Sequence, residues 1–373
     1  MKFTTPSYVF ELDRISQNLE KISRFRKEAP CKVLLALKGA SSKSLLSVLL
    51  PHLDGVSASG AFEARLGKEH HTLVSVFSPA YTAENFPAIL ENSDIVVFNS
   101  LNQFETYSSL IHKSKKTCGI RLNPMYSELS DTFTANPCRR YSHLGIRRQE
   151  LPPISTFGPG GIEGIHFHTM CGQNADTLSR TIEYLVQNFD MYLRRVSWIN
   201  IGGGQLYGAE DYQIDTAVQA IRRLARLYNV PIYAEPCEGI LTGSGFYVTT
   251  VTDIVHNEMD IAILDGSAVC HLTDAVYRGW KRDVLNGGEP GDFPYTVRLV
   301  GNSCYAGDIF GEYSFPQPLK RGEKVIFCDT ASYTAVKACM FNGLPLPSMV
   351  LYSRAGGIKS IKKYDYHVFR QTL

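Results

Sequence analysis

Four features of this sequence have the chemistry of a cofactor site, and each follows a short apolar run. Lys38 follows VLLAL, His168 ends GIEGIHFH, the glycines 202–204 follow VSWINI, and Glu235 ends PIYAE. A lysine at the edge of a hydrophobic core favours its neutral amine, because desolvation disfavours the ammonium, and a neutral amine can attack an aldehyde to form a Schiff base. Taken alone, Lys38 also fits a simpler role, with its stem along apolar surface and its charge in water.

The other three features suit an aldehyde cofactor that carries a phosphate and a pyridine ring. Consecutive glycines let backbone N–H groups approach a phosphate closely, although a tight turn explains them equally well. A carboxylate such as Glu235 can keep a pyridine nitrogen protonated, and its alternative is an ion pair, for example with Arg121. His168 can stack on a planar ring or be a core histidine, and His166 shares its face of the strand. Together the four features predict pyridoxal 5′-phosphate.

Short apolar runs recur through the first two thirds of the chain, and a stretch long enough for one helix separates most of them. Their length and lack of charge predict buried strands. Eight such strands alternating with helices predict a (β/α)8 TIM barrel, with an open doubly wound sheet as the alternative. In a barrel, chemistry lies at the carboxyl ends of the strands, where all four features fall. The expected strands are 32–38, 53–59, 73–78, 94–99, 118–123, 161–168, 196–202 and 231–235.

The character of the sequence changes near Gly243, where helical periodicity fades and short β-rich segments follow. Turns rich in Gly, Pro and Asn separate these segments. We therefore expect a cofactor-binding barrel over residues 12–243 and a mainly β domain over 244–373. Because an isolated N-terminal strand needs partners, we expect residues 1–11 to pair into the β domain. The strands expected there are 246–254, 261–265, 295–300, 324–328, 349–352 and 366–370.

Residues 124–160 form an unusually long connection that is rich in Pro, Ser, Asn and Arg. A loop of this length inside a compact domain is usually functional or mobile. Within it, residues 142–146 (SHLGI) either brace the barrel mouth or form a surface turn.

The composition is that of an ordinary globular protein. The 373 residues are 44% hydrophobic and 20% charged, with a net charge of +2, so no strong field points to nucleic acid. No apolar run is long enough for a membrane helix, and the N-terminal residues lack the apolar core of a signal peptide. Nine cysteines occur without CxxC pairs, and no HExxH-type spacing is present, which argues against a metal site or a disulfide scaffold. We expect a cytoplasmic protein with reduced thiols and no metal, nucleic-acid or membrane partner.

Three motifs carry a resemblance to a known family: LLALKG at 34–39, HFHTMCGQN at 166–174 and GNSCYAGD at 301–308. The sequence resembles the fold-type III pyridoxal-phosphate decarboxylases, which include ornithine, diaminopimelate and carboxynorspermidine decarboxylases. The resemblance covers nearly the whole chain and is strongest to the carboxynorspermidine (carboxyspermidine) decarboxylases. It implies an alanine-racemase-like barrel followed by a β domain, pyridoxal 5′-phosphate as the cofactor, and a homodimer with shared active sites.

The resemblance also implies which residues bind the cofactor. Lys38 matches the catalytic lysine that forms the Schiff base, and Tyr333 matches a tyrosine that reaches the phosphate. Cys171 stands where relatives often have a serine that touches the phosphate. Apart from the resemblance, an ion pair between Arg121 and Glu235 would let the arginine orient that carboxylate. The complete set expected to bind the cofactor is Lys38, Arg121, His168, Cys171, Gly202, Gly203, Gly204, Glu235 and Tyr333.

Further residues are assigned to catalysis and substrate binding. Cys304 matches a cysteine contributed by a second subunit, and we expect it to reprotonate Cα after CO2 leaves. Relatives typically read EPGR where this chain has EPCE at 235–238, so the acid Glu238 replaces an arginine. An acid near a phosphate would repel it, and we therefore expect Glu238 to face a cationic substrate. Glu238, Asp274 and Asp308 would form an acidic lining for a polyamine tail, with Asp308 supplied in trans alongside Cys304.

The sequence thus predicts an enzyme that decarboxylates carboxynorspermidine, carboxyspermidine or both, to norspermidine or spermidine. The alternatives are decarboxylation of diaminopimelate, ornithine or lysine by the same residues, a non-catalytic pyridoxal-phosphate carrier, and a racemase. A carrier needs no second-subunit cysteine, and racemases usually place a tyrosine base where this chain has Cys304. One methylene separates the two carboxylated polyamines, a difference worth about 1–3 kcal/mol in a pocket.

Overall fold

The structure is a computed structural model that describes residues 3–373, and it divides into two compact units. One unit takes the chain up to Gln17 together with Leu241–Leu373, and the other takes Asn18–Ile240. The first long helix, α1 (Leu12–Glu28), begins in the former unit and ends in the latter.

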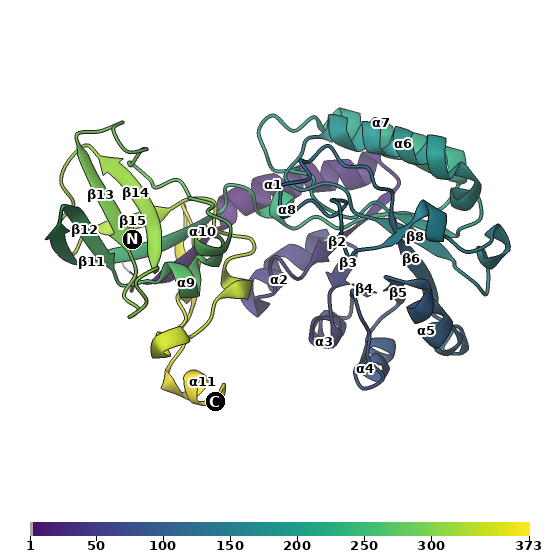
Figure 1. The fold of residues 1–373 in the computed structure, drawn as a ribbon, viewed down its shortest axis with the longest axis horizontal. Helices are drawn as coiled ribbons and strands as arrows, with labels where there is room; N and C mark the ends of the chain where they lie inside the picture. The colour runs from purple at the N-terminus through teal and green to yellow at the C-terminus, as the bar shows by residue number, and fades with distance from the viewer. Residues whose placement is uncertain (1–2) are drawn as a thin grey trace. The chain divides into compact units, whose positions relative to one another are not determined.

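Eight parallel strands close into a barrel in the unit Asn18–Ile240 (Figure 1). They pair in the order β5-β4-β3-β2-β10-β9-β8-β6, and β5 also pairs with β6. Because this last pairing joins the two ends of the order, the sheet is a closed barrel, which confirms the predicted fold and excludes the open sheet. The strands are β2 (Cys31–Ala36), β3 (Gly55–Ala58), β4 (Leu73–Phe77), β5 (Ile95–Phe98), β6 (Thr117–Asn123), β8 (Gly164–Phe167), β9 (Trp198–Asn200) and β10 (Ile232–Ala234).

Amphipathic helices follow the barrel strands in sequence. Helix α6 illustrates why they form, since Asn174 caps its first turn and Leu178, Ile182, Leu185 and Phe189 recur at helical spacing on its buried face. The helices of this unit after α1 are α2 (Lys43–Leu49), α3 (Ala61–Glu69), α4 (Phe86–Glu91), α5 (Leu101–Lys113), α6 (Ala175–Leu193), α7 (Ile214–Tyr228) and the short α8 (Glu238–Leu241), which reaches the unit boundary.

Trp198 packs near the amino ends of the strands, where its indole lies against Gly119 and Gly164. A Cβ atom would lie 2.6 Å from the Trp198 ring at Gly119 and 1.9 Å from it at Gly164, so only glycine fits there. The ring belongs to a buried apolar cluster with Leu34, Ile95, Val97 and Tyr233. This cluster packs apolar side chains around the Trp198 ring near the amino-terminal end of the barrel.

Asparagines at the ends of β5 and β6 hold the SHLGI segment of the long connection. Asn99 donates from Nδ2 to the carbonyl oxygen of His143 (2.9 Å) and accepts from the Gly145 amide (2.6 Å). Asn123 donates to the carbonyl oxygen of Leu144 (3.1 Å), and the next residues form β7 (Ile146–Arg147), which pairs with β6. The segment thus rests on the carboxyl ends of two barrel strands.

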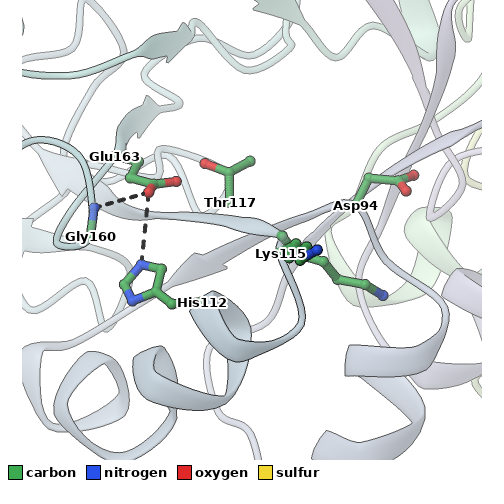
Figure 2. Close-up of a pocket in the computed structure, with 7 residues that line it drawn as sticks. Asp94, His112, Lys115, Thr117, Gly160 and Glu163 are labelled. Atoms are coloured by element: carbon green, nitrogen blue, oxygen red, sulfur yellow. Dashed lines mark hydrogen bonds and ion pairs between the residues drawn. The ribbon is translucent and has the colours of Figure 1, made fainter.

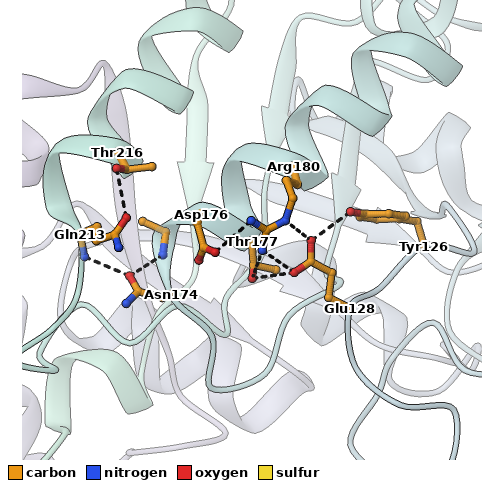
Figure 3. Close-up of polar contacts among 9 residues, drawn as sticks. Tyr126, Glu128, Asn174, Asp176, Thr177, Arg180, Gln213 and Thr216 are labelled. Atoms are coloured by element: carbon orange, nitrogen blue, oxygen red, sulfur yellow. Dashed lines mark hydrogen bonds and ion pairs between the residues drawn. The ribbon is translucent and has the colours of Figure 1, made fainter.

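The start of the same connection is tied to helix α6 (Figure 3). Arg180 donates to both oxygens of Glu128, at 2.5 and 2.7 Å, and Thr177 also donates to Glu128. Tyr126 stacks on Tyr184 with ring centroids 4.4 Å apart. Two short 3-10 turns, Arg148–Glu150 and Ile154–Thr156, complete the connection. These contacts hold the long segment against the barrel at several points.

The other unit is built on a mixed sheet in the order β14-β13-β12-β11-β1-β16-β17, with β15 paired to β11. The N-terminal strand β1 lies inside this sheet, antiparallel to β11 and parallel to β16. Val9 packs there with Val248 and Val350. The strands are β1 (Ser7–Glu11), β11 (Gly245–Asn257), β12 (Met259–Leu264), β13 (Tyr295–Val300), β14 (Ile309–Phe315), β15 (Lys324–Phe327), β16 (Ser348–Ser353) and β17 (Gly357–Lys362).

The structure corrects the strand predictions for this unit in three places. Residues 366–370, expected as a strand, form the helix α11 (Tyr366–Arg370), because Asp365 accepts from the Val368 amide and caps the first turn. Strand β14 was missed because Gly311 and polar residues interrupt its apolar pattern. Strand β17 was missed because it is an edge strand with exposed lysines, a composition typical of protected edges.

Short helices complete the unit: α9 (Ala268–His271), α10 (Thr273–Tyr277) and the 3-10 turns Ala335–Lys337 and Phe341–Gly343. A further 3-10 turn, Leu50–His52, follows α2 in the barrel unit. Among the helices within residues 3–373, none has the length and apolar character needed to cross a membrane.

Candidate active site

Lys38 lies two residues beyond β2, in a turn closed by the Gly39 and Ala40 amides, which donate to Ala36 and Leu37. Its side chain is accessible to solvent, and its amine makes no hydrogen bond or ion pair with any residue of the range 3–373. The surrounding protein still desolvates the ammonium and lowers its pKa, while the Glu235 carboxylate opposes this shift. Lys38 thus presents an unpaired amine with a lowered pKa just beyond the carboxyl end of β2.

Glu235 follows β10, and its side chain is only 11% exposed. Asn200, the last residue of β9, donates from Nδ2 to Glu235 Oε1 at 2.7 Å, and His166 Nε2 lies 3.6 Å from Oε2. Burial alone would raise the pKa of Glu235, but His166, Asn200 and Lys38 together lower it to about 2. The carboxylate is therefore ionised at neutral pH.

The sequence allowed an ion pair between Arg121 and Glu235. Within residues 3–373, no ion pair or hydrogen bond joins these two side chains. The Arg121 guanidinium lies 4.6 Å from the centroid of the Phe77 ring instead. Burial lowers the pKa of Arg121 to about 10, although Cys138 and Glu235 oppose that shift. Arg121 remains a cation at neutral pH and adds to the positive charge around Glu235.

The structure distinguishes the two histidines that the sequence could not separate. His166 lies inside the barrel, 2% exposed, and its ring centroid is 5.5 Å from that of Phe77. His168 lies beyond the end of β8, where the Gly203 amide donates to its Nδ1 at 3.1 Å. Burial lowers the pKa of both rings, most strongly at His168, where the charges of Lys38 and Arg121 act in the same direction. His168 is therefore neutral, with Nδ1 as an acceptor.

The glycine turn 202–204 is required by close packing between strand ends. Gly202 and Gly204 have φ values of +66° and +95°, a conformation that favours glycine. A Cβ atom would lie 2.3 Å from the Glu235 carbonyl oxygen at Gly203, and 2.1 Å from the Met170 carbonyl oxygen at Gly204.

Only part of the glycine turn is open to a ligand. The Gly202 amide donates to Asn200 Oδ1 and the Gly203 amide to His168, whereas the Gly204 amide has no partner within residues 3–373. The glycines are therefore needed for the packing of the turn itself, and the turn also leaves one unpaired N–H group that can bind an anion.

Two further predicted residues belong to this unit. Cys171 is partly buried, and its amide donates to Gln173 Oε1 at 3.4 Å. Glu238 is partly buried and begins α8, three residues after Glu235. A third acid of this unit, Glu63, accepts from the Ser59 amide at 2.6 Å; burial raises the pKa of its carboxyl group, and the charge of Lys38 opposes that shift.

A cavity of about 520 Å³, lined by polar residues, lies at the amino-terminal end of the barrel, opposite to Lys38 and Glu235, where β5, β6 and β8 begin (Figure 2). Its acids are already paired: Asp94 with Lys68 at 2.6 Å, and Glu163 with His112 at 3.9 Å and the Gly160 amide at 3.2 Å. In barrels of this kind, chemistry lies at the carboxyl ends of the strands, so charge pairs at the amino ends contribute to stability. The cavity therefore does not compete with the carboxyl end as the active site.

The remaining predicted residues, Cys304, Asp308, Asp274 and Tyr333, lie in the β unit. Asp274 accepts two hydrogen bonds from Lys337, at 2.7 and 2.8 Å, so its charge is compensated. Tyr333 is partly buried, with φ at +55°. The Cys304 thiol is exposed, while its amide donates to the side chain of Asn342 at 2.9 Å.

Asp308, predicted to line the substrate site of a second copy, is held by its own loop within this chain. Asp308 is 2% exposed, and both carboxylate oxygens are occupied. Oδ1 accepts from the Ala268 and Val269 amides, at 2.7 and 3.1 Å, and Oδ2 accepts from the Ser303 amide and hydroxyl, at 3.2 and 2.7 Å. This carboxylate supports its own loop, because four hydrogen-bond donors occupy its two buried oxygens.

Comparisons with known proteins agree with this arrangement. Residues 85–331 match a family model whose description is "Pyridoxal-dependent decarboxylase, C-terminal sheet domain". The carboxynorspermidine/carboxyspermidine decarboxylase of Campylobacter jejuni is 33% identical over 98% of this chain and 97% of its own length. The carboxyaminopropylagmatine decarboxylase of Synechocystis is 33% identical over 99% of this chain and 95% of its own length. The crystal structure of C. jejuni carboxynorspermidine decarboxylase with norspermidine has a TM-score of 0.89 and 31% identity, and the match covers 100% of both chains.

The chain belongs to the fold-type III pyridoxal-dependent decarboxylases.

Membership in this family establishes pyridoxal 5′-phosphate as the cofactor, and the barrel residues fit it. Lys38 has an unpaired amine with a lowered pKa for the aldehyde carbon. The unpaired Gly204 amide suits an anionic phosphate, and the ionised Glu235 suits a protonated pyridine nitrogen.

Asn200 is the residue of this decarboxylase site that sequence reasoning missed. It holds Glu235 through Nδ2 and the Gly202 amide through Oδ1, at 2.7 and 2.9 Å, so it links the acid to the glycine turn. The signal was present in the sequence, since Asn200 is a lone polar residue inside the apolar run VSWINI. A buried amide in such a run needs partners, and strand ends supply them.

Proposed function

We propose that this enzyme removes the α-carboxylate of carboxynorspermidine, carboxyspermidine or both, and releases norspermidine or spermidine. The observation that carries the proposal is the full-length similarity, in sequence and in fold, to a carboxynorspermidine decarboxylase whose structure holds norspermidine. The chemistry of the barrel end adds support, because it combines an available amine with an ionised acid held by two neighbours.

The barrel residues would hold the cofactor in one orientation. Pyridoxal phosphate bound at Lys38 supplies an electron-poor ring that accepts the electron pair left at Cα when CO2 departs. Glu235, oriented by Asn200, would keep the pyridine nitrogen protonated, and Arg121 would contribute positive charge nearby. The other residues in the proposed cofactor set are His168 against the ring, and Cys171, Gly202, Gly203, Gly204 and Tyr333 toward the phosphate.

Cys304 would return a proton to Cα after CO2 leaves. Its thiol is exposed on the β unit, as expected for a group that acts at another surface. We propose that it acts in the active site of a second copy of the chain, so that a homodimer has two shared sites. A concentration-dependent loss of activity on dilution would accompany dissociation of such a dimer.

Glu238 would recognise the cationic tail of the substrate. It lies three residues from Glu235, at the start of α8, and its charge attracts an ammonium and repels a distal carboxylate such as that of diaminopimelate. Asp274 would bind the same tail only by exchanging Lys337 for a substrate ammonium, because Lys337 already donates to both of its oxygens. We take Glu238 as the principal substrate acid of the proposal because it lies three residues after Glu235, at the carboxyl end of the barrel.

A second candidate substrate is carboxyaminopropylagmatine, since the Synechocystis relative is as similar to this chain as the C. jejuni protein. Its guanidinium tail is also cationic and suits the same acid. Diaminopimelate, ornithine and lysine are further candidates for the same chemistry, and a non-catalytic pyridoxal-phosphate carrier is the alternative outside catalysis.

The test is CO2 release by the protein reconstituted with pyridoxal phosphate. Carboxynorspermidine, carboxyspermidine, carboxyaminopropylagmatine, diaminopimelate, ornithine and lysine are offered separately. Release at the highest kcat/KM from a carboxylated polyamine supports the proposal. If kcat/KM is higher with carboxyaminopropylagmatine than with either carboxylated polyamine, carboxyaminopropylagmatine becomes the proposed substrate. If none of the six compounds releases CO2 although the cofactor is bound, the result favours a non-catalytic carrier.

A further inference from the structure

The GNSCYAGD loop, residues 301–308, is closed on itself by its last residue. The Gly301 amide donates to the Asp308 carbonyl oxygen at 2.8 Å, and the Asp308 amide donates to Tyr305 at 2.9 Å. A Cβ atom on Gly301 would lie 2.2 Å from Asp308 Oδ2, so glycine lets the carboxylate lie against the start of the loop. The loop is thus folded around the Asp308 side chain.

The same carboxylate fixes the loop to a buried framework. Oδ1 accepts from the Ala268 and Val269 amides at the start of α9. Ser267 caps that turn, since its hydroxyl accepts from the Cys270 amide at 3.1 Å, and its own amide donates to His271 Nδ1 at 3.1 Å. Ser267, Cys270 and His271 are all buried, so the anchor of the loop has little freedom to move.

Cys304 is the residue that this arrangement holds in place. Its neighbour Ser303 donates to Asp308 Oδ2 through both its amide and its hydroxyl. The Cys304 amide donates to Asn342 Oδ1. The backbone of Cys304 is therefore fixed on two sides while its thiol stays exposed.

We propose that Asp308 is a positioning residue, which fixes the Cys304 loop so that the thiol can deliver its proton to Cα. The inference rests on the proposed function, in which Cys304 is the donor. In that step the S–H bond breaks, a C–H bond forms with the electron pair at Cα, and the thiolate takes a proton from solvent. A misplaced donor slows this step, and a displacement of about 1 Å can cost about a hundredfold in rate.

The test compares Asp308→Asn with Asp292→Asn. The first change keeps the size of the side chain but turns one oxygen into an NH2 group that faces N–H or O–H donors. The control makes the same change in an exposed turn of the same unit, where Asp292 accepts from the Glu289 amide. Ser303→Ala removes the hydroxyl bond to Asp308 and the long bond, 3.4 Å, that the Tyr305 amide donates to the same hydroxyl. It keeps the carboxylate and serves as a milder second variant if Asp308→Asn folds poorly.

The measurements are kcat and KM with the best carboxylated polyamine, and the ratio of aldehyde to amine product. A proton delivered to the cofactor's carbon instead of Cα would leave the substrate nitrogen on the cofactor, and hydrolysis by water would then release an aldehyde in place of the amine. Loss of fold alone does not change this ratio. We expect Asp308→Asn to lower kcat about tenfold to a hundredfold, to leave KM within about twofold, and to raise the aldehyde fraction as Cys304→Ala does. Ser303→Ala should shift both readouts in the same direction by less, and Asp292→Asn should shift neither.

The double variant Asp308→Asn/Cys304→Ala separates the possible explanations. If Asp308 acts through Cys304, the double variant is no slower than Cys304→Ala. Effects that multiply, or an unchanged aldehyde fraction in Asp308→Asn and Ser303→Ala, would overturn the positioning role while leaving Cys304 as donor. A Cys304→Ala enzyme with wild-type kcat would refute the donor role itself, and the inference with it.

Discussion

Asn200→Ala is the substitution with the best-defined structural cost. Asn200 is 1% exposed and makes two hydrogen bonds, one to the Glu235 carboxylate and one from the Gly202 amide. Alanine leaves a buried charge with one donor fewer and a buried N–H without its acceptor. A bond to a charged group contributes about 1.5–3 kcal/mol and a neutral one about 0.5–1.5 kcal/mol. We therefore expect the free energy of unfolding to fall by about 2–4.5 kcal/mol.

Asn123→Ala is the matched control, since Asn123 is 2% exposed at the end of β6 and also makes two hydrogen bonds. Its partners are the Leu144 carbonyl oxygen and the Met125 amide, both uncharged. We expect it to cost about 1–3 kcal/mol. Only Asn200→Ala should also loosen pyridoxal phosphate and lower kcat, by about tenfold or more, because only Asn200 orients Glu235.

The assay is urea unfolding of both variants without added cofactor, followed by far-UV circular dichroism, with cofactor retention and kcat measured on the same preparations. A loss of less than about 0.5 kcal/mol in Asn200→Ala, a change within the range of ordinary surface substitutions, would refute the assigned hydrogen bonds. Equal losses of cofactor and kcat in the two variants would refute the role of Asn200 in orienting Glu235.

Three further predictions concern the same barrel end. Lys38→Ala should abolish turnover, while Lys32→Ala, an exposed change in β2, the strand that precedes Lys38, should keep it; measurable CO2 release from the former would contradict the assignment. The folded pKa of Glu235, about 2, lies below its ordinary 4.5, so its stabilising contribution is complete above about pH 4.5 and is lost as the pH falls toward 2. This contribution is on the order of 3 kcal/mol, and Glu235→Gln should flatten the stability profile across that window; an unchanged slope would argue against an ionised buried carboxylate. Glu238→Arg should raise KM for carboxylated polyamines and leave the cofactor dissociation constant unchanged, and the opposite pattern would place Glu238 at the phosphate.

The barrel could be predicted because its strands are buried on both faces and therefore read as short uncharged apolar runs. The positions of Lys38 and Glu235 followed from the same reasoning, since the carboxyl ends of parallel strands converge at one end of a barrel. Family resemblance supplied the cofactor roles, which local patterns alone left open.

Features that depend on tertiary contacts could not be predicted from the sequence. His166 and His168 share a strand period, but β8 ends at Phe167, so His168 leaves the strand geometry that the alternation assumes. Asp308 was taken as a ligand for substrate because an acid near Cys304 suits a polyamine, yet its burial is set by α9, some forty residues earlier in the chain. Residues 366–370 have a strand-like composition but form a helix, because the Asp365 side chain caps its first turn.

The most direct test of the central claim is to identify the lysine that binds the cofactor. The protein is incubated with pyridoxal phosphate, reduced with borohydride so that the Schiff base becomes a stable amine, digested, and mapped by mass spectrometry. We expect one phosphopyridoxyl group per chain, on Lys38. Modification of another lysine at full occupancy, or none on a chain that retains the cofactor, would contradict the site described above.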